Sequence, residues 1–270
     1  MNNISLKKTF KKLKKEGKKA FMPYVCCGDL GTSFTESLIE TLYKNGADVI
    51  ELGIPFSDPV ADGPTIQAAS QRALKGKTTP KDAFEVIQNI RKKRVLAPIV
   101  VMAYYNIVFR AGVEKFAREV AKAGGQALLC PDVPIEESAQ LQKACKKAKI
   151  NCIYLAAPNT PTKRLKNILK KAKGFLYLVS VTGITGARKN VAKTALELIK
   201  RARKHAKIPL ALGFGVSNPV QAREIAKTGA SGIIVGSKII NLYQRLAING
   251  RKKQALEKVA VFARQLKNAL

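Results

Sequence analysis

Residues 98–130 read PIVVMAYYNIVFRAGVEKFAREVAKAGGQALLC, and this stretch decides the fold. It begins and ends with short apolar runs, at residues 98–103 and 126–130, each about as long as a β-strand. Between these runs, four apolar residues follow the i, i+3, i+4, i+7 spacing of an amphipathic helix: Val113, Phe116, Ala117 and Val120. The stretch therefore predicts a strand, a helix and a second strand, which is the repeating unit of parallel sheets.

The same alternation extends along the whole chain. Six further apolar runs lie at residues 21–27, 47–52, 151–155, 175–179, 208–212 and 231–235. Helical spacing recurs between the runs, for example at residues 141–148 and 165–172. Three dipeptides place a capping side chain before a proline that suits the first helical position: Thr79-Pro80, Thr160-Pro161 and Asn218-Pro219.

Eight alternations without a break in composition predict a parallel sheet covered by helices. Both an open doubly wound sheet and a closed (β/α)8 barrel fit this pattern. The count of eight, the length of 270 residues and the lack of a GxGxxG motif after the first run favour the barrel. We therefore predict an α/β fold, a (β/α)8 TIM barrel formed by residues 1–270 as a single domain. Leu6, Phe10 and Leu13 predict an extra N-terminal helix, and residues 250–270 predict a last one.

The composition excludes several classes of function. The apolar runs are too short to cross a bilayer, so we expect no membrane association. The one histidine, His205, lies in a lysine-rich helical stretch. This argues against histidine-dependent nucleophilic catalysis and against a histidine-rich metal site, and we expect no metal.

The cysteines indicate a reducing compartment. There are five of them, an odd number, no CxxC pair occurs, and no secretory leader precedes them: Cys26, Cys27, Cys130, Cys145 and Cys152. We expect reduced thiols in a cytoplasmic protein, and a plastid stroma fits equally well.

The net charge of +31 raises a separate hypothesis, because so basic a chain attracts polyanions. A polyanion-binding or partner-activating module is therefore one alternative. However, the charge comes mostly from lysine pairs such as Lys92-Lys93 on the polar faces of predicted helices. Aromatic residues do not interleave with these lysines and no recognition motif occurs, so we expect no specific nucleic-acid partner.

The chemistry of a barrel lies at the carboxyl ends of its strands, and the second run leads into an acidic stretch there. Residues 48–62 hold four of the chain's 18 acidic residues. Glu51 ends the buried run, where desolvation raises the pKa of a carboxyl group and suits it to proton transfer near neutral pH. Asp62 lies in a Pro/Gly-bounded loop that can reach back over the same opening. The alternative is that these acids cap turns or pair with lysines.

Glycine-containing turns follow the last three runs, at residues 182–186, 213–218 and 236–237. Glycine lets a ligand approach the backbone closely, and amides at a helix N-terminus attract anions. In this fold the late loops are the usual phosphate-binding place. The turns therefore predict a phosphorylated substrate, with simple turn formation as the alternative.

Residues 51–64, ELGIPFSDPVADGP, resemble the signature of the tryptophan synthase α subunit family. The resemblance continues through PDVP at 131–134, SVTGITG at 180–186 and GFGVS at 213–217, and it covers nearly the whole chain. It implies a lyase of tryptophan biosynthesis that cleaves indole-3-glycerol phosphate to indole and glyceraldehyde 3-phosphate by a retro-aldol reaction. It also implies that this chain carries no cofactor and that a β subunit, which uses pyridoxal phosphate (PLP), receives the indole in an α2β2 assembly. A stand-alone lyase that releases free indole is the alternative.

The resemblance also implies roles for single residues. By this resemblance, Glu51 is the acid/base. Asp62 is the carboxylate that holds the indole N–H and stabilises the positive charge that develops on the indole. Tyr177 lies next to the catalytic Glu, and Thr185 is the loop threonine that meets the Asp when the site closes. The phosphate-binding turns are matched by Gly186, Phe214, Gly215, Gly236 and Ser237.

The remaining implied residues form the pocket wall and the partner surface. Tyr24, Met102, Leu129 and Ile66 match positions around the indole, with plain core packing as the alternative for the last three. Asp58 and Asn106 match positions that face the β subunit. One departure lies at residues 26–31, CCGDLG, where the family usually has a sequence of the type Thr-Ala-Gly-Asp-Pro.

Overall fold

Eight parallel strands form a closed barrel in the computed structural model, which describes residues 4–179, 188–213 and 215–270. The strands follow one another in chain order, and the last pairs with the first. The strands are β1 (Ala20–Cys26), β2 (Ile50–Gly53), β3 (Ile99–Met102), β4 (Ala127–Leu129), β5 (Asn151–Ala156), β6 (Leu176–Val179), β7 (Leu210–Gly213) and β8 (Gly232–Val235). Each lies within one of the predicted apolar runs or within a residue of it, so the predicted fold class is confirmed.

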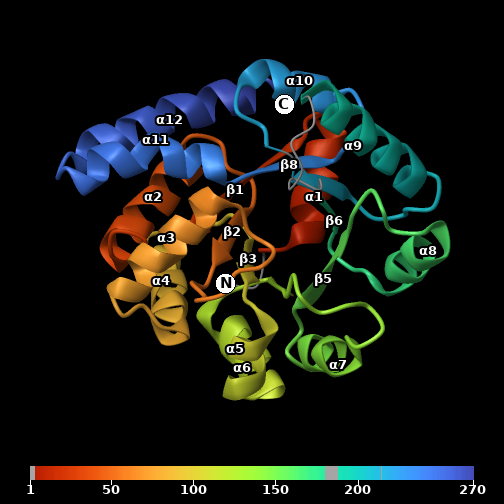
Figure 1. Cartoon of the computed structure of the whole chain (residues 1–270), viewed down its shortest axis with the longest axis horizontal. Coiled ribbons are helices and arrows are strands. Elements are labelled where there is room, and N and C mark those ends of the chain that lie inside the picture. The colour runs from red at the N-terminus through yellow and green to blue at the C-terminus, as the bar shows by residue number, and fades with distance from the viewer. Residues whose placement is uncertain (1–3, 180–187, 214) are drawn as a thin grey trace.

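A ring of helices surrounds the strands (Figure 1). The helices are α1 (Leu6–Lys15), α2 (Thr32–Lys44), α3 (Pro64–Lys75), α4 (Pro80–Lys92), α5 (Tyr105–Ala111), α6 (Val113–Ala123), α7 (Ala139–Lys147), α8 (Thr162–Lys171), α9 (Arg188–Arg203), α10 (Pro219–Ala226), α11 (Ser237–Ile248) and α12 (Lys252–Asn268). The apolar stripe predicted within residues 98–130 is the inner face of α6, where Val113, Phe116 and Val120 are buried. No helix in this described part of the chain is long and apolar enough to cross a membrane.

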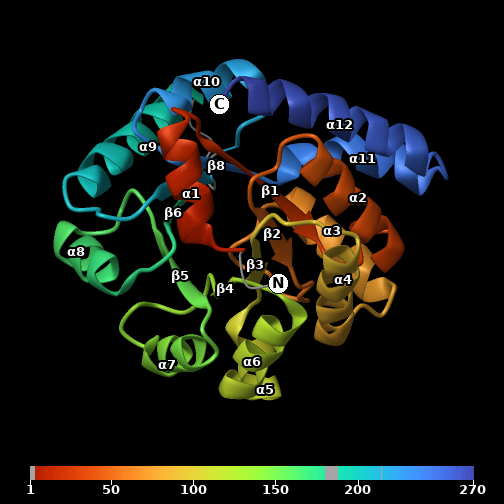
Figure 2. The same cartoon turned by 180° about the vertical axis from the view of Figure 1, so that it is seen from behind.

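Helix α1 covers the amino-terminal end of the barrel (Figure 2). Its apolar residues Leu6, Phe10 and Leu13 are buried, as their spacing predicts. The Phe10 ring lies 5.9 Å from the ring of Phe175, the residue just before β6. The predicted N-terminal helix is therefore confirmed, and so is the last one, which is α12.

Two of the three predicted helix starts are confirmed. Thr79 forms a reciprocal capping box with Asp82, and the Asn218 side chain accepts a hydrogen bond from the backbone N–H of Gln221. The third prediction is wrong by one residue, because Pro161 is itself the N-cap and α8 begins at Thr162. The Thr160 hydroxyl instead accepts from the N–H of Ala157 at 2.9 Å, so it closes the preceding turn and does not cap the helix.

Candidate active site

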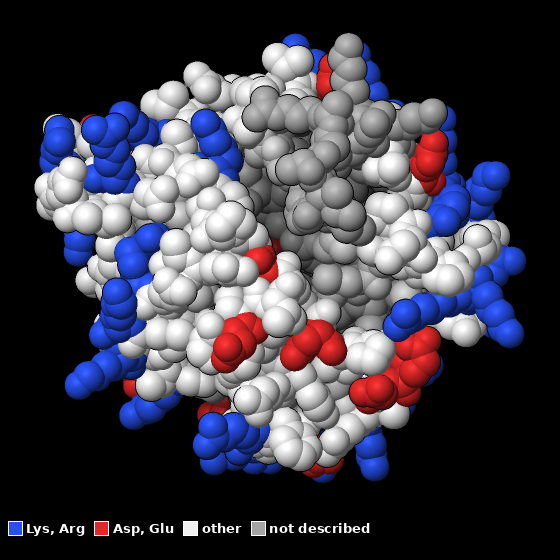
Figure 3. All heavy atoms as spheres, in the orientation of Figure 1, with Lys and Arg blue, Asp and Glu red and all other residues white. Residues whose placement is uncertain are grey.

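The carboxyl ends of the strands open onto a cavity of about 510 Å³. Side chains from β1, β2, β3, β4, β5, β6 and β8 line it, together with residues of the loops at this end of the barrel. Figure 3 shows a central hollow on this face, with acidic side chains close to it and most lysines and arginines around the edge. The basic surface is thus largely separate from the mouth of the barrel.

Glu51 lies on the floor of this cavity. It is the second residue of β2, in register with Tyr24 of β1 and Val100 of β3. Because side chains alternate along a strand, Glu51 points to the barrel interior while Leu52 packs among the helices. Only 2% of Glu51 is exposed. Burial, assisted by the nearby Asp62 carboxylate, raises the pKa of Glu51 to about 8.

Two tyrosines flank Glu51, and two glycines make room for them. The Tyr24 ring lies against Gly53, and the Tyr177 ring lies against Gly213. In each case a ring carbon is 2.6 Å from the place that a Cβ atom would occupy, so a larger residue at either glycine displaces the ring. The glycines at these strand ends thus serve close packing around the buried carboxyl group.

Asp62 reaches the same cavity from the loop between β2 and α3. The hydroxyl of Tyr104 donates a hydrogen bond to Asp62 Oδ2 at 3.0 Å, and accepts one from the N–H of Ala61, also at 3.0 Å. Gln67 Nε2 donates to the backbone oxygen of Asp62 at 2.9 Å. Burial raises the pKa of Asp62 to about 6, against the lowering effect of the Tyr104 hydrogen bond. Asp62 is therefore held by contacts on both sides.

The two carboxyl groups occupy different protonation states at neutral pH. With pKa values of about 8 and about 6, Glu51 is mostly protonated and Asp62 is mostly ionised. A pair of acids whose environments separate their pKa values is a common arrangement for acid–base catalysis. The site therefore offers a proton donor and a negative charge to the same bound molecule.

The wall of the cavity is mostly apolar. The structure places all four predicted pocket residues there: Tyr24, Met102, Leu129 and Ile66. Leu155, Val179 and Ile234 also line the wall, and the sequence did not single these residues out. Such a surface is suited to a flat apolar ring.

A polar rim completes the cavity at the ends of β7 and β8. Gly215, Gly236 and Ser237 line the cavity, and Ser237 is the first residue of the twelve-residue helix α11. The N–H groups of the first residues of a helix attract negative charge, and in α11 these precede the first bond of the helix, from the Ile239 N–H to the Gly236 oxygen at 2.9 Å. Thr185, Gly186 and Phe214, which were predicted for the same region, lie outside the described residues.

Asp58 and Asn106 lie outside the cavity, on the exposed surface beside its mouth. Two large apolar side chains share these segments, with Val60 84% exposed and Phe109 63% exposed. The rings of Phe56 and Tyr104 stack at 5.0 Å, which joins the loop of Asp58 to the start of α5. This surface is thus connected to Asp62 through a single tyrosine.

Two of the predicted acids have other positions. Asp48 precedes β2, at the far end of the strand from the cavity, and its carboxylate accepts hydrogen bonds from Lys267 Nζ at 2.6 Å and from the Phe21 N–H at 2.8 Å. Of the four acids in residues 48–62, only Glu51 and Asp62 face the cavity. Asp48 forms an ion pair away from it, and Asp58 is exposed. Among the described residues, no cluster of His, Cys, Asp and Glu is suited to hold a metal ion.

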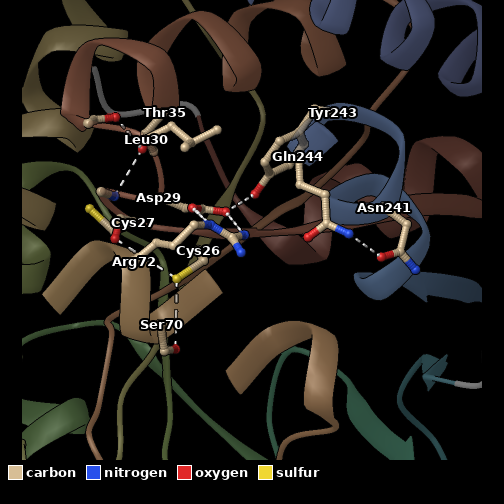
Figure 4. A network of polar contacts seen from close by, with 12 residues as sticks. Cys26, Cys27, Asp29, Leu30, Thr35, Ser70, Arg72, Asn241, Tyr243 and Gln244 are labelled. Atoms are coloured by element: carbon tan, nitrogen blue, oxygen red, sulfur yellow. Dashed lines mark hydrogen bonds and ion pairs between the residues drawn. The ribbon is translucent and has the colours of Figure 1, made fainter. Parts of the chain in front are cut away.

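A polar network around Asp29, which follows the end of β1, joins α3 to α11 (Figure 4). Asp29 is 1% exposed and accepts two hydrogen bonds from Arg72 of α3, at 2.7 and 2.8 Å. It accepts a third from the Tyr243 hydroxyl of α11, at 2.6 Å. Helix α3 begins two residues after Asp62, and α11 begins at Ser237. By binding both helices, Asp29 therefore fixes the position of Ser237 and of the segment that leads from Asp62. Sequence reasoning missed this network, since no local pattern links residues 29, 72 and 243.

Replacing Asp29 with alanine is expected to lower the free energy of unfolding by about 3 kcal/mol, because it leaves the Arg72 guanidinium and the Tyr243 hydroxyl without their acceptor. Urea denaturation followed by circular dichroism measures the change. The matched control is Glu16→Ala, which removes exposed ion pairs with Lys12 and Lys18 and is expected to cost less than about 1 kcal/mol. Equal losses in the two variants would contradict the prediction.

The fold and the cavity define the class of protein: a (β/α)8 barrel with two carboxyl groups in a cavity at the carboxyl ends of its strands. A sequence model of the tryptophan synthase alpha chain matches residues 10–270. The chain belongs to the tryptophan synthase alpha chain family. The alpha chain of Methanocaldococcus jannaschii is 45% identical over 251 residues, which cover 93% of this chain and 89% of that one. The alpha chain of Picosynechococcus is 42% identical, over 98% of this chain and 99% of its relative.

Solved structures show the same relationship. The alpha subunit of Legionella pneumophila superposes with a TM-score of 0.89 at 33% identity, over 98% of this chain and 97% of that one. A tryptophan synthase complex from Pyrococcus furiosus contains a chain with a TM-score of 0.83 at 36% identity, over 92% of this chain and 98% of that chain. The resemblance that the sequence motifs indicated is therefore confirmed over nearly the full length.

Proposed function

We propose that Glu51 and Asp62 carry out in this chain the reaction of its family, the cleavage of indole-3-glycerol phosphate to indole and glyceraldehyde 3-phosphate. One observation supports this assignment above the others. A single cavity brings together a buried glutamic acid, an ionised aspartate and a helix N-terminus flanked by glycines. The reaction requires all three features: a proton donor at C3 of the indole, a negative charge at the indole N–H and an anion site for the phosphate.

Each carboxyl group has its own part in the reaction. Glu51 donates its proton to C3 of the indole ring, and the ionised Asp62 accepts a hydrogen bond from the indole N–H and stabilises the positive charge that develops there. The bond between C3 and the glycerol chain then breaks, and its electron pair returns to the ring. Glu51, now a carboxylate, takes the proton of the adjacent hydroxyl group as that carbon becomes the aldehyde. The glutamic acid is thereby regenerated.

The other predicted residues position the substrate. We assign Tyr24, Met102, Leu129 and Ile66 to the indole, and Gly215, Gly236 and Ser237 to the phosphate. Tyr177 lies beside Glu51 and limits the access of water to it. The family resemblance adds Gly186 and Phe214 to the phosphate site, and Thr185 as the residue that meets Asp62 on closure of the loop.

The chain works with a tryptophan synthase beta chain in an α2β2 assembly. It carries no cofactor itself, and the PLP of the enzyme belongs to the beta chain. We assign Asp58 and Asn106 to the surface that contacts this partner. The exposed side chains of Val60 and Phe109 support the assignment, since apolar residues on a monomer surface are typical of a contact with another protein.

The organisation and location of the chain follow from the same features. Residues 1–270 act as one domain, because α1 and α12 complete the barrel at either end of the chain. All five cysteines are free, which supports a reducing compartment such as a cytoplasm or a plastid stroma.

The test of this function is the release of indole from indole-3-glycerol phosphate as a function of pH, with and without a beta chain. We expect kcat/KM to be bell-shaped. It falls as pH decreases through about 6, because Asp62 loses its charge, and it falls as pH rises through about 8, because Glu51 loses its proton. No indole at any pH, or a flat profile between about pH 5 and pH 9, would contradict the assignment.

The variant Tyr104→Phe is an internal control for the acidic limb. The Tyr104 hydrogen bond lowers the pKa of Asp62, so its loss moves the acidic limb to higher pH. The alkaline limb, which reports Glu51, is expected to stay in place.

A further inference from the structure

Lys238 brings a positive charge to the active-site cavity. Among the described residues that line this cavity, it is the only lysine, arginine or histidine. It is the second residue of α11 and directly follows Gly236 and Ser237, to which we assign the phosphate. The first turn of α11 contains no acidic residue. An anion bound at the start of this helix therefore meets a positive side chain there and no negative one from the same turn.

The ammonium group of Lys238 is not committed to a carboxylate. Within the described ranges of the chain it forms no ion pair. Its Nζ atom lies instead over the ring of Phe262 in α12, 6.0 Å from the ring centre. This distance is the outer limit of a cation–π contact, so the contact is weak. A charge-assisted hydrogen bond to a phosphate is stronger, and a bound phosphate can therefore draw the ammonium group away from the ring.

Lys238 stands on the border between two hollows. It lines the active-site cavity, and it also lines a groove of about 730 Å³ between α10, α11 and α12. Phe262 lines the groove and not the cavity. Because a lysine side chain is a flexible stem of four carbons, a rotation of this stem carries the ammonium group from the groove to the cavity.

The charge of the cavity gives this lysine a function. A phosphate monoester carries a charge of about −1.5 to −2 at pH 7. At the same pH Asp62 is mostly ionised and Glu51 is mostly protonated, so the carboxyl groups of the cavity together repel the phosphate. The positive charge of Lys238 offsets that of Asp62. It therefore makes the cavity tolerant of a dianion without removing the negative charge that the indole N–H needs.

A second polar side chain of α11 lies on the same face as Lys238. Asn241 follows it by three residues and lines the same cavity. The side-chain oxygen of Asn241 accepts a hydrogen bond from Gln244 Nε2 at 2.9 Å (Figure 4). The NH2 group is then the end of Asn241 that donates to a ligand. The start of α11 thus presents donors only: an ammonium group, an amide and the hydroxyl of Ser237.

We propose that Lys238 is a phosphate-binding residue of this active site, whose ammonium group leaves the Phe262 ring and donates to the phosphate of the bound substrate. The inference rests on the proposed function, which places the phosphate at Gly236 and Ser237. The phosphate is at the far end of the substrate from the bond that breaks. Lys238 therefore binds the substrate and the transition state equally well, and its charge contributes to KM and not to kcat.

The experiment compares the full-length wild type with Lys238→Met, with a beta chain present. Methionine keeps an apolar stem beside Phe262 but has no charge. The KM for indole-3-glycerol phosphate is expected to rise roughly tenfold, the effect of one charge-assisted hydrogen bond, while kcat stays unchanged. Lys238→Arg restores the charge and is expected to recover most of the loss. An unchanged KM in Lys238→Met would overturn the proposal, as would a loss of urea stability without a rise in KM.

The matched control is Lys258→Met. Lys258 lies on α12 and lines the same groove as Lys238, but it does not line the active-site cavity. The two variants change the net charge equally, and Lys258→Met is expected to keep the wild-type KM. An equal rise of KM in both variants would show an effect of net charge alone and would overturn the assignment to Lys238.

Binding of glycerol 3-phosphate, followed by phosphorus NMR without turnover, separates this inference from the proposed function. The Kd is expected to be roughly tenfold higher for Lys238→Met than for wild type and Lys258→Met. Binding that depends on Lys238, together with no indole release by wild type, would overturn the proposed function and support this inference. Indole release by wild type, together with equal KM and Kd values in Lys238→Met, would overturn this inference alone. A wild type that neither binds nor cleaves would overturn both.

Discussion

Replacing Glu51 with glutamine is expected to lower kcat/KM for the cleavage of indole-3-glycerol phosphate by roughly 10²–10⁴-fold, the usual contribution of a general acid–base group. Glutamine keeps the shape of the side chain but cannot donate the proton to the indole ring or accept the hydroxyl proton. The measurement is the initial rate of indole release by the full-length chain, with a beta chain present.

The stability of Glu51→Gln separates a chemical effect from loss of the fold. Burial of a charged carboxylate is unfavourable, so a neutral amide of similar size is expected to leave the free energy of unfolding unchanged or higher. The control Glu85→Gln alters an exposed residue of α4 and is expected to keep wild-type activity. Activity within a few-fold of wild type in Glu51→Gln would show that this carboxyl group does not transfer the proton.

Asp62→Asn is expected to reduce kcat/KM by roughly 10²–10³-fold, the range found when one stabilising group of a transition state is removed. The amide can still contact the indole N–H, but it brings no negative charge to the ring as positive charge develops there. Indole release again measures the effect, and Glu85→Gln again serves as the surface control.

The pH profile of Asp62→Asn gives an independent check. The acidic limb near pH 6 should disappear, because the group that titrates there is absent, while the alkaline limb near pH 8 should remain. An acidic limb that persists unchanged in this variant would assign it to another group.

Much of the architecture was predictable because it is encoded locally. Strand and helix periods differ, so the alternation of apolar runs with amphipathic segments predicted the barrel. The burial of Glu51 was predicted from its place in an apolar run, and the structure adds that its side chain points to the barrel interior. The loop position of Asp62 predicted that it reaches the same opening, and the resemblance to a family then implied separate roles for the two acids.

The remaining features depend on contacts between distant segments. The hydrogen bond from Tyr104 to Asp62 and the network around Asp29 join residues that are far apart in the chain, and no period or spacing encodes them. Thr160 shows what a local pattern cannot decide. The same side chain can cap a helix or close a turn, and in the structure it closes the turn. Asp48 looked like part of the acidic site, but its partner Lys267 lies at the opposite end of the sequence.

The position of helix α1 bears on the route by which small molecules enter and leave the barrel. Its residues Leu6, Phe10 and Leu13 are buried at the amino-terminal end of the barrel, and the cavity opens at the other end. We therefore expect substrate and products to pass through the same opening, so that a beta chain bound beside it would receive the indole as it leaves.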